Sequence, residues 1–176
     1  MSYRPICDVW LLARPKVKYY GSYPGGFLER ARALLGVNIN DPVLHVCGGK
    51  VREYPYRGGF GPNDKTLDLD PALNPDFCQS AEAPLPVGPW AGILADPPYT
   101  EGDADHYAPT RTALPNPNVV LRNCLASVPV GGRVGVLHYV APRPPKTAKF
   151  IALVAVFMGY GNRARFYSVF ERRDKA

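Results

Sequence analysis

The sequence predicts an α/β fold built on a mainly parallel sheet. Three observations support this: short, uniformly apolar runs, a glycine or an acid directly after several of them, and helical periodicity in between. Parallel strands buried on both faces are apolar throughout. Open α/β sheets bind their ligands at the carboxyl ends of their strands. We therefore expect the functional residues in the turns that follow the apolar runs.

Length and composition fit one folded domain with a basic surface. The 176 residues are 46% hydrophobic, which is enough for a substantial core. We expect a single domain over residues 1–176, with an N-terminal extension at 1–40 and a core at 41–176. The formal net charge of +6 favours a polyanionic partner. Several basic residues lie near the two ends of the sequence, interleaved with aromatics: Arg14, Lys16, Lys18, Arg163, Arg165, Arg172, Arg173 and Lys175.

Cysteine usage favours a reducing compartment. Cys7, Cys47, Cys78 and Cys124 form no C-x-x-C pair, so we expect buried free thiols, no metal site and no disulfide framework. The longest apolar stretch, at 150–158, is shorter than the ~20 residues that cross a bilayer. The start of the sequence lacks the apolar core of a signal peptide. We therefore expect a cytoplasmic protein that does not enter membranes.

The first forty residues are predicted to form a strand, a loop and a helix. Residues 6–12 (ICDVWLL) are apolar enough for a short strand or edge element. Residues 27–35 place apolar side chains at helical spacing, and Gly36 follows as a natural helix stop. A loop rich in tyrosine, lysine and glycine at residues 16–26 connects the two.

A strand that ends in a glycine turn is predicted at residues 42–49. The apolar run PVLHVC continues into Gly48 and Gly49, which let a backbone approach a ligand without a Cβ in the way. Proline and further glycines interrupt the residues that follow, so we expect the first crossover to be a loop. The chain has no G-x-x-x-x-G-K-[ST] pattern, which disfavours a nucleoside triphosphatase.

An acid ends the next predicted strand, at residues 65–70 (KTLDLD). In a Rossmann-like sheet, an acid about 20 residues after the glycine turn hydrogen-bonds a ribose diol. Asp68 fits this spacing best and Asp70 second. The alternative interpretation is that each is an ordinary turn residue or helix cap.

The fourth predicted strand, at residues 90–95, runs into Asp96-Pro97-Pro98-Tyr99. Neither proline can donate a ladder hydrogen bond, so together they end the strand. The carboxylate and the phenol are therefore expected on a stiff turn at the carboxyl edge of the sheet. An ordinary strand-ending turn is the alternative, since Asp-Pro and Pro-Pro are common turn dipeptides.

The remaining elements complete the α/β pattern. A third strand and its loop are predicted at 76–86, and a mobile polar loop at 100–109. A helix at 118–127 leads through a Gly-Gly turn into a strand at 134–140. Apolar runs at 150–158 and 165–171, separated by the turn GYGN, predict an antiparallel pair at the end of the sheet.

The tetrapeptide at 96–99, placed after an apolar strand, resembles the catalytic motif of amino-methyltransferases that use S-adenosylmethionine. It looks most like the enzymes that methylate N6 of adenine in DNA. An exocyclic amine is a poor nucleophile because its lone pair is delocalised into the ring. A carboxylate and a backbone carbonyl on a rigid turn accept its hydrogen bonds and align it with the methyl donor. The aromatic ring can stack on a base taken out of the helix.

This resemblance, together with the order of the elements over about residues 40–172, implies a Rossmann-like class I methyltransferase fold. The sheet would be seven-stranded and mainly parallel with an antiparallel last strand, and helices would cover both faces. The implied cofactor is S-adenosylmethionine. The implied catalytic residues are Asp96, Pro97, Pro98 and Tyr99. The implied cofactor-binding residues are Tyr23, Pro24, Gly25, Cys47, Gly48, Gly49, Asp68, Asp70, Gln79 and Asp96, with Gln79, Glu82 or Asp76 meeting the adenine ring.

Three functions are weighed against one another. Methylation of DNA adenine at N6 comes first, and methylation of an RNA base amine, guanine N2 or adenine N6, is second. A non-catalytic nucleic-acid-binding module on a decayed methyltransferase fold is the alternative from another class. A separate target-recognition domain does not fit in 176 residues. Loops at 19–26, 58–65 and 100–118, a second subunit of a homodimer, or a partner protein would therefore read the substrate.

Overall fold

The computed structural model describes residues 4–17, 19, 21–107, 114–159 and 163–174. Lys18 and Lys175 of the predicted basic clusters, and part of the predicted loop at 100–118, lie outside the described residues. The strands are β1 (Ile6–Leu11), β2 (Val43–Val46), β3 (Lys65–Asp68), β4 (Phe77–Cys78), β5 (Gly92–Ala95), β6 (Arg133–His138), β7 (Ala148–Phe157) and β8 (Arg165–Arg172). The helices are α1 (Phe27–Leu35), α2 (Glu101–Tyr107) and α3 (Pro117–Ser127), with 3-10 turns η1 (Val51–Glu53) and η2 (Pro71–Leu73).

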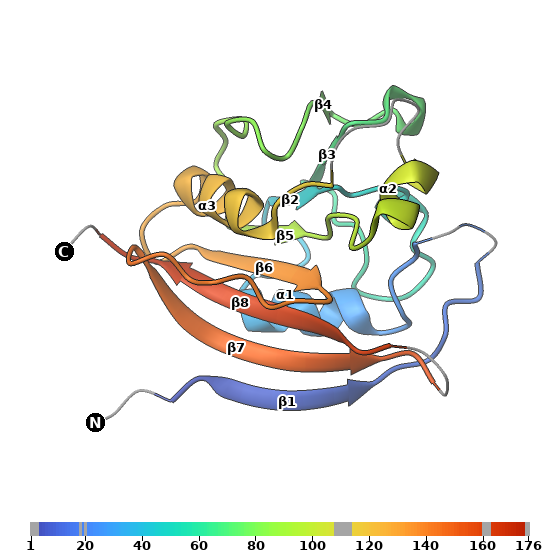
Figure 1. The fold of residues 1–176 in the computed structure, drawn as a ribbon, viewed down its shortest axis with the longest axis horizontal. Coiled ribbons are helices and arrows are strands. Elements are labelled where there is room, and N and C mark those ends of the chain that lie inside the picture. The colour runs from blue at the N-terminus through green and yellow to red at the C-terminus, as the bar shows by residue number, and fades with distance from the viewer. Residues whose placement is uncertain (1–3, 18, 20, 108–113, 160–162, 175–176) are drawn as a thin grey trace.

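The strands form one mixed sheet in the order β1-β7-β8-β6-β5-β2-β3-β4. β8 runs antiparallel to both β6 and β7, and the other neighbouring pairs are parallel. The predicted mainly parallel sheet with an antiparallel last strand is therefore confirmed. The predicted strand number is wrong, because β1 joins β7 and adds an eighth strand at one edge (Figure 1). Trp10 anchors β1, since its side chain is buried in the core beneath β7 and β8.

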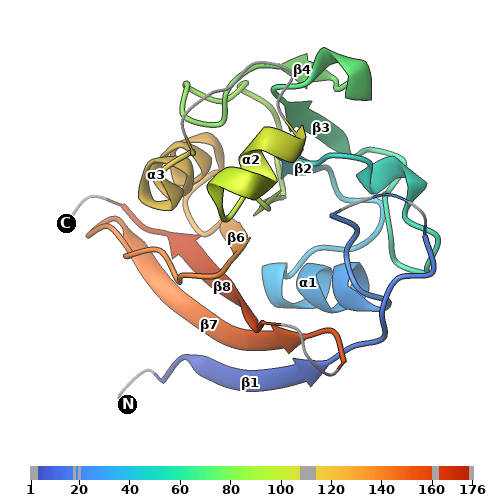
Figure 2. The ribbon, with the colours of Figure 1, turned by 45° about the vertical axis from the view of Figure 1, so that its right-hand side comes forward.

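Helices cover both faces of the sheet, as predicted. Alternate residues of a strand point to opposite faces, and the central strands show this directly. Leu94 and Leu137 pack into the core that contains α1, whereas Ile93 and Val136 pack into the core that contains α3. Figure 2 shows the two helices on opposite sides of β6.

The connections between the strands from β2 to β5 contain no α-helix. The first crossover, between β2 and β3, contains only the turn η1, which confirms the expected loop. The predicted third strand shrinks to Phe77–Cys78. The prediction of a polar loop at 100–109 is wrong over most of that range, because helix α2 occupies Glu101–Tyr107. Thr100 and Asp103 explain the helix, since each side chain accepts a hydrogen bond from the backbone N–H of the other, as in a capping box.

The cysteines depart in part from the expected burial. Cys124 is buried and Cys47 is half-buried, but Cys7 and Cys78 are exposed on short edge strands. All four are free thiols. In the part of the chain that the structure describes, no helix is both long enough and apolar enough to span a bilayer.

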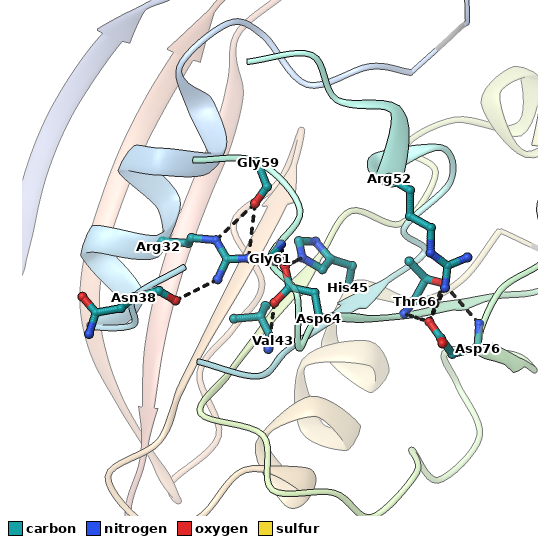
Figure 3. A network of polar contacts seen from close by, with 10 residues as sticks. All are labelled: Arg32, Asn38, Val43, His45, Arg52, Gly59, Gly61, Asp64, Thr66 and Asp76. Atoms are coloured by element: carbon teal, nitrogen blue, oxygen red, sulfur yellow. Dashed lines mark hydrogen bonds and ion pairs between the residues drawn. The ribbon is translucent and has the colours of Figure 1, made fainter. Parts of the chain in front are cut away.

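A buried polar network ties α1 to β2 and to the loop before β3 (Figure 3). Asp64, 4% exposed, forms an ion pair with Arg32 of α1. The same carboxylate accepts a hydrogen bond from Nε2 of His45, at 3.0 Å, and from the backbone N–H groups of Val43 and Gly61. Burial lowers the pKa of His45, so its imidazole is neutral and the charges of the network cancel.

This network places residues 58–65 in the scaffold. The carbonyl oxygen of Gly59 accepts hydrogen bonds from Arg32, and a Cβ at Gly61 would lie 2.1 Å from the carbonyl oxygen of Ile39. No residue of 58–65 lines either of the cavities described below. The expectation that this loop reads the substrate is therefore not supported by its position.

Candidate active site

Two cavities meet at the carboxyl edge of the sheet, where β2, β3 and β5 end. The first cavity, about 420 Å³, lies over the ends of β2 and β3. The second, about 440 Å³, lies beside the turn that follows β5. The loop before α1 and the helix α2 contribute to their walls, and both lie at this edge in Figure 2. The residues that line both cavities are Tyr19, Gly21, Ser22, Asp96 and Pro98.

The glycine turn after β2 forms one wall of the first cavity. Cys47 has a φ of 53°, in the left-handed region that residues other than glycine rarely occupy. A Cβ at Gly48 would lie 3.0 Å from the carbonyl oxygen of His45, so a side chain there would crowd the turn. Gly49 donates its N–H to the Asp68 carboxylate at 2.9 Å. The turn therefore packs tightly against β2 and β3, while Cys47, Gly48 and Gly49 line the cavity.

Asp68 and Asp70 both line the first cavity, at the end of β3 and in the turn beyond it. Asp68 is half-buried and also accepts the Asp70 N–H at 3.2 Å. Burial raises its pKa. Asp70 is also half-buried, and its side chain caps η2 by accepting the N–H of Ala72. Both acids therefore line the cavity, and they differ in their partners: Asp68 holds the glycine turn, whereas Asp70 caps η2.

Of the three candidates for the adenine contact, Gln79 and Glu82 line the first cavity. Asp76 does not. Its carboxylate pairs with Arg52 and Lys65 and accepts the N–H of Thr66, as Figure 3 shows in part. Asp76 therefore serves the β3–β4 edge of the sheet.

The segment before α1 contributes Tyr23 to the first cavity. Its ring stacks on Phe27 with centroids 5.1 Å apart, and its hydroxyl is buried with no hydrogen-bond partner among the described residues. Burial and the nearby Asp96 raise the pKa of this phenol well above its usual value, so it remains a donor. Pro24 and Gly25 lie outside the cavity lining. The Pro24 carbonyl accepts a hydrogen bond from Tyr54, and Gly25 pairs with Ala13, so both hold the loop in place.

Asp96, Pro97, Pro98 and Tyr99 all line the second cavity. The Tyr99 hydroxyl donates a hydrogen bond to the Asp96 carboxylate and lies 3.5 Å from Nη1 of Arg165. Burial raises the pKa of Asp96 to about 6, although the Arg165 charge and the Tyr99 hydrogen bond lower it. Near pH 7.5 the carboxylate is therefore mostly ionised and can accept hydrogen bonds.

Tyr99 is held by two residues at the end of β6. Its ring lies edge-to-face with His138 at a centroid distance of 5.2 Å, and 4.7 Å from Tyr139. Nδ1 of His138 accepts the N–H of Val140 at 3.0 Å, which places the imidazole proton on Nε2. His138 lines neither cavity, so it packs against Tyr99 without contributing to a cavity wall.

Several residues that line the second cavity were not predicted as site residues from sequence motifs. Tyr139, Met158 and Arg165 line the second cavity but belong to no recognised motif. Tyr139 directly follows a strand, so the rule that ligands bind at strand ends could have found it. Arg163 and Arg165 were recognised only as part of a basic cluster.

Comparisons with known proteins place the fold. No protein-family model and no curated protein matches the sequence. Among solved structures, the chain is similar to TrmN from Thermus thermophilus, with a TM-score of 0.61 and 20% identity over 87% of this chain and 50% of TrmN. It therefore spans about half of the TrmN chain.

Two further structures extend the comparison. An rRNA methylase from Streptococcus thermophilus matches with a TM-score of 0.54 and 10% identity over 88% of this chain and 100% of that one. A mutant of MtNAS in complex with S-adenosylmethionine matches with a TM-score of 0.52 and 10% identity, over 84% of this chain and 60% of that one. The fold is the Rossmann-like fold of methyltransferases, as the sequence predicted.

Proposed function

We propose that this chain is an S-adenosylmethionine-dependent methyltransferase that acts on an exocyclic amino group of a nucleic-acid base. The observation that carries the proposal is the meeting of the two cavities at Asp96 and Pro98. A methyl donor in one cavity and an amine in the other would meet at this carboxylate. Proximity of this kind accounts for much of the rate of a group transfer.

The first cavity fits the proposed cofactor. A side chain at Gly48 would crowd its glycine turn, and the carboxylate of Asp68 lines the cavity, where it could accept hydrogen bonds from a ribose diol. The unpartnered hydroxyl of Tyr23 offers a donor. When bound, S-adenosylmethionine would supply a methyl group from its sulfonium centre. The MtNAS structure, which has a similar fold, is in complex with this compound.

The second cavity fits an aromatic amine. The ionised Asp96 can accept a hydrogen bond from the amine, draw electron density towards its nitrogen and receive the proton released on methylation. Pro97 and Pro98 keep the acceptor fixed, because each proline locks its own φ. The ring of Tyr99 offers a stacking surface for a flipped base.

Nucleic acid is the proposed substrate because Arg14 and Arg163 line the second cavity and are largely exposed, where they can meet phosphates. We propose N6 of adenine in DNA as the first target, on the resemblance of the Asp-Pro-Pro-Tyr turn. A base amine in RNA is the second candidate. It is favoured by the similarity to an rRNA methylase whose whole chain is covered.

Tritiated methyl transfer to DNA and RNA pools, followed by nucleoside analysis, tests activity, polymer and base together. We expect a methylated amino base with the wild-type protein and a loss of about 100-fold or more with Asp96→Ala, because the acceptor of the amine is gone. Binding of S-adenosylmethionine by this variant should persist in calorimetry. Asp174→Ala is the matched control, since it lies beyond the far end of β8.

Two outcomes would contradict the proposal. Full activity of Asp96→Ala would remove the catalytic assignment. Nucleic-acid binding by a wild-type protein that neither binds the cofactor nor transfers a methyl group would instead support the non-catalytic module.

A further inference from the structure

Arg165 is a buried cation at the wall of the second cavity. It opens β8 and is only 6% exposed. Its guanidinium donates to the Tyr99 hydroxyl at 3.5 Å and to the Met158 sulfur at 3.1 Å. No carboxylate of the described residues lies within ion-pair distance of it. The residues that the structure does not describe include no aspartate or glutamate.

Each terminal nitrogen of the guanidinium has one partner, and both partners are weak acceptors. Arginine carries five N–H donors in a planar fork. A thioether sulfur is a weak acceptor, and 3.5 Å is at the outer limit of a hydrogen bond. The Asp96 carboxylate lies beyond the Tyr99 hydroxyl and interacts with Arg165 through its charge, without a direct ion pair. A buried cation is costly unless its donors find acceptors. Because Arg165 lines the cavity, the missing acceptor is expected on the molecule that fills it.

We propose that Arg165 donates a hydrogen bond to a ring nitrogen beside the amino group that is methylated, and that this contact favours adenine, whose amine has such a nitrogen on both sides. The inference rests on the proposed function and deepens it by naming the base. Asp96 reads the amine as a donor, and Arg165 reads its neighbour as an acceptor. Tyr99 bridges the two side chains, which fixes their separation.

Base chemistry explains the selection. The adenine amine has an unprotonated ring nitrogen on each side, N1 on one and N7 on the other. The cytosine amine has such a nitrogen, N3, on one side only, and the guanine amine has N3 on one side and a protonated N1 on the other. Adenine alone therefore offers Arg165 an acceptor on whichever side of the amine it lies. A guanidinium cannot accept a hydrogen bond, so it disfavours the side of guanine that carries that proton.

The position of Arg165 favours a base contact over a phosphate contact. Arg163 and Arg14 line the same cavity but are exposed, which suits a solvated backbone. Arg165 lies deeper, against the ring that is proposed to stack on the base. It lines the second cavity and not the first, so the carboxylate of the cofactor is a poorer match.

A double-mutant cycle, in which one change is made in the protein and the other in the substrate base, tests the proposal. Oligonucleotides with adenine, 1-deazaadenine or 7-deazaadenine at the methylated site are compared with wild-type protein and Arg165→Met. We expect one deaza substitution to lower wild-type kcat/KM by about tenfold or more and to have little further effect in Arg165→Met. Arg122→Met, an exposed position on α3, makes the same side-chain change and should behave as wild type.

Other outcomes overturn the proposal. Independent effects of the deaza bases and of Arg165→Met would show that Arg165 does not contact the ring. A uniform loss on all bases with a shallower salt dependence would identify a phosphate contact. Weaker binding of S-adenosylmethionine by a folded Arg165→Met in calorimetry would identify a cofactor contact. Methylation mainly of guanine or cytosine by wild type would refute adenine selection, while no methylation of any base counts against the proposed function itself.

If thermal unfolding shows that Arg165→Met is misfolded, Arg165→Lys replaces it in the cycle. Lysine keeps the positive charge but loses the planar fork. We expect this variant to fold and, because its ammonium still donates hydrogen bonds, to keep part of the coupling to the same ring nitrogen. Absence of any effect of either deaza base on the wild-type protein would overturn the proposed hydrogen bond, whichever variant folds.

Discussion

At the scale of single residues, Asp96 links protonation to the proposed activity. Burial raises its pKa to about 6, and only the ionised form can receive the proton that the amine releases. We expect kcat/KM to be constant above this pKa and to fall about tenfold per pH unit below it. Methyl transfer measured between pH 5 and 9 gives the profile.

Tyr99→Phe provides the control for this profile. The tyrosine hydrogen bond lowers the pKa of Asp96, so its removal should move the acid limb of the profile to higher pH. A profile that stays flat down to pH 5 in the wild-type protein would contradict the role of Asp96.

Asp68 and Asp70 can be separated by their effects on cofactor affinity. Asp68 lines the first cavity and also anchors the N–H of Gly49, whereas Asp70 caps η2. We expect Asp68→Ala to weaken S-adenosylmethionine binding by about 1.5–3 kcal/mol, because a ribose hydroxyl pair loses its acceptor. Asp70→Ala should change it by much less. Isothermal titration calorimetry of both variants measures the two affinities. A larger loss of affinity in Asp70→Ala than in Asp68→Ala would assign the ribose contact to Asp70.

Sequence reasoning reached Asp96 and Gly48 because local chemistry specifies both. Prolines must end a strand, and glycine must occupy a turn with no space for a Cβ. Arg165 was out of reach for a topological reason. It starts a strand that runs antiparallel to its neighbours, so the beginning of β8 lies at the edge where the parallel strands end. Nothing within a few residues of position 165 carries that information.

At the scale of elements, β6 depends on one glycine. A Cβ at Gly135 would lie 2.3 Å from the hydroxyl oxygen of Tyr167 and 2.5 Å from a carbon of its ring. Tyr167 is fully buried, and its hydroxyl donates to the carbonyl oxygen of Ala31 on α1. We expect Gly135→Ala to lower the free energy of unfolding by about 1–3 kcal/mol through overpacking. Thermal unfolding should show a Tm lower by roughly 2–10 °C.

Gly102→Ala is the matched control for this prediction. Gly102 lies in α2, and the nearest atom to its added Cβ would be 3.8 Å away. Alanine favours a helix over glycine by about 0.5–1 kcal/mol, so this variant should be unchanged or slightly more stable. Equal losses in both variants would show that the space behind Gly135 is not the cause.

Elements were predicted best where the pattern was long and periodic. The helix at 27–35 matches α1 in both bounds, and the apolar runs became β2, β5, β6, β7 and β8. The short β4 was overestimated because residues 79–86 carry no alternation that marks a strand end. α2 was missed because its polar composition outweighed the capping pattern of Thr100 and Asp103.

At the scale of the whole molecule, the class of fold could be predicted but the size of the sheet could not. The order of strand, turn, acid and helix can be predicted from local sequence patterns, whereas the strand that pairs with β1 cannot. β1 pairs with β7, almost the whole described chain away, and Trp10 secures it from one side. No local pattern distinguishes that pairing from a free edge element.

The pairing of the first strand with β7 also sets an order of events during synthesis. Ile6 lies opposite Ala152, so β1 has no partner until most of the chain has left the ribosome. At about 5–20 residues per second, that interval lasts on the order of ten seconds. During it, the apolar side chains of β1 have no native neighbour from β7, and the sheet can close at this edge only after the body of the protein is made.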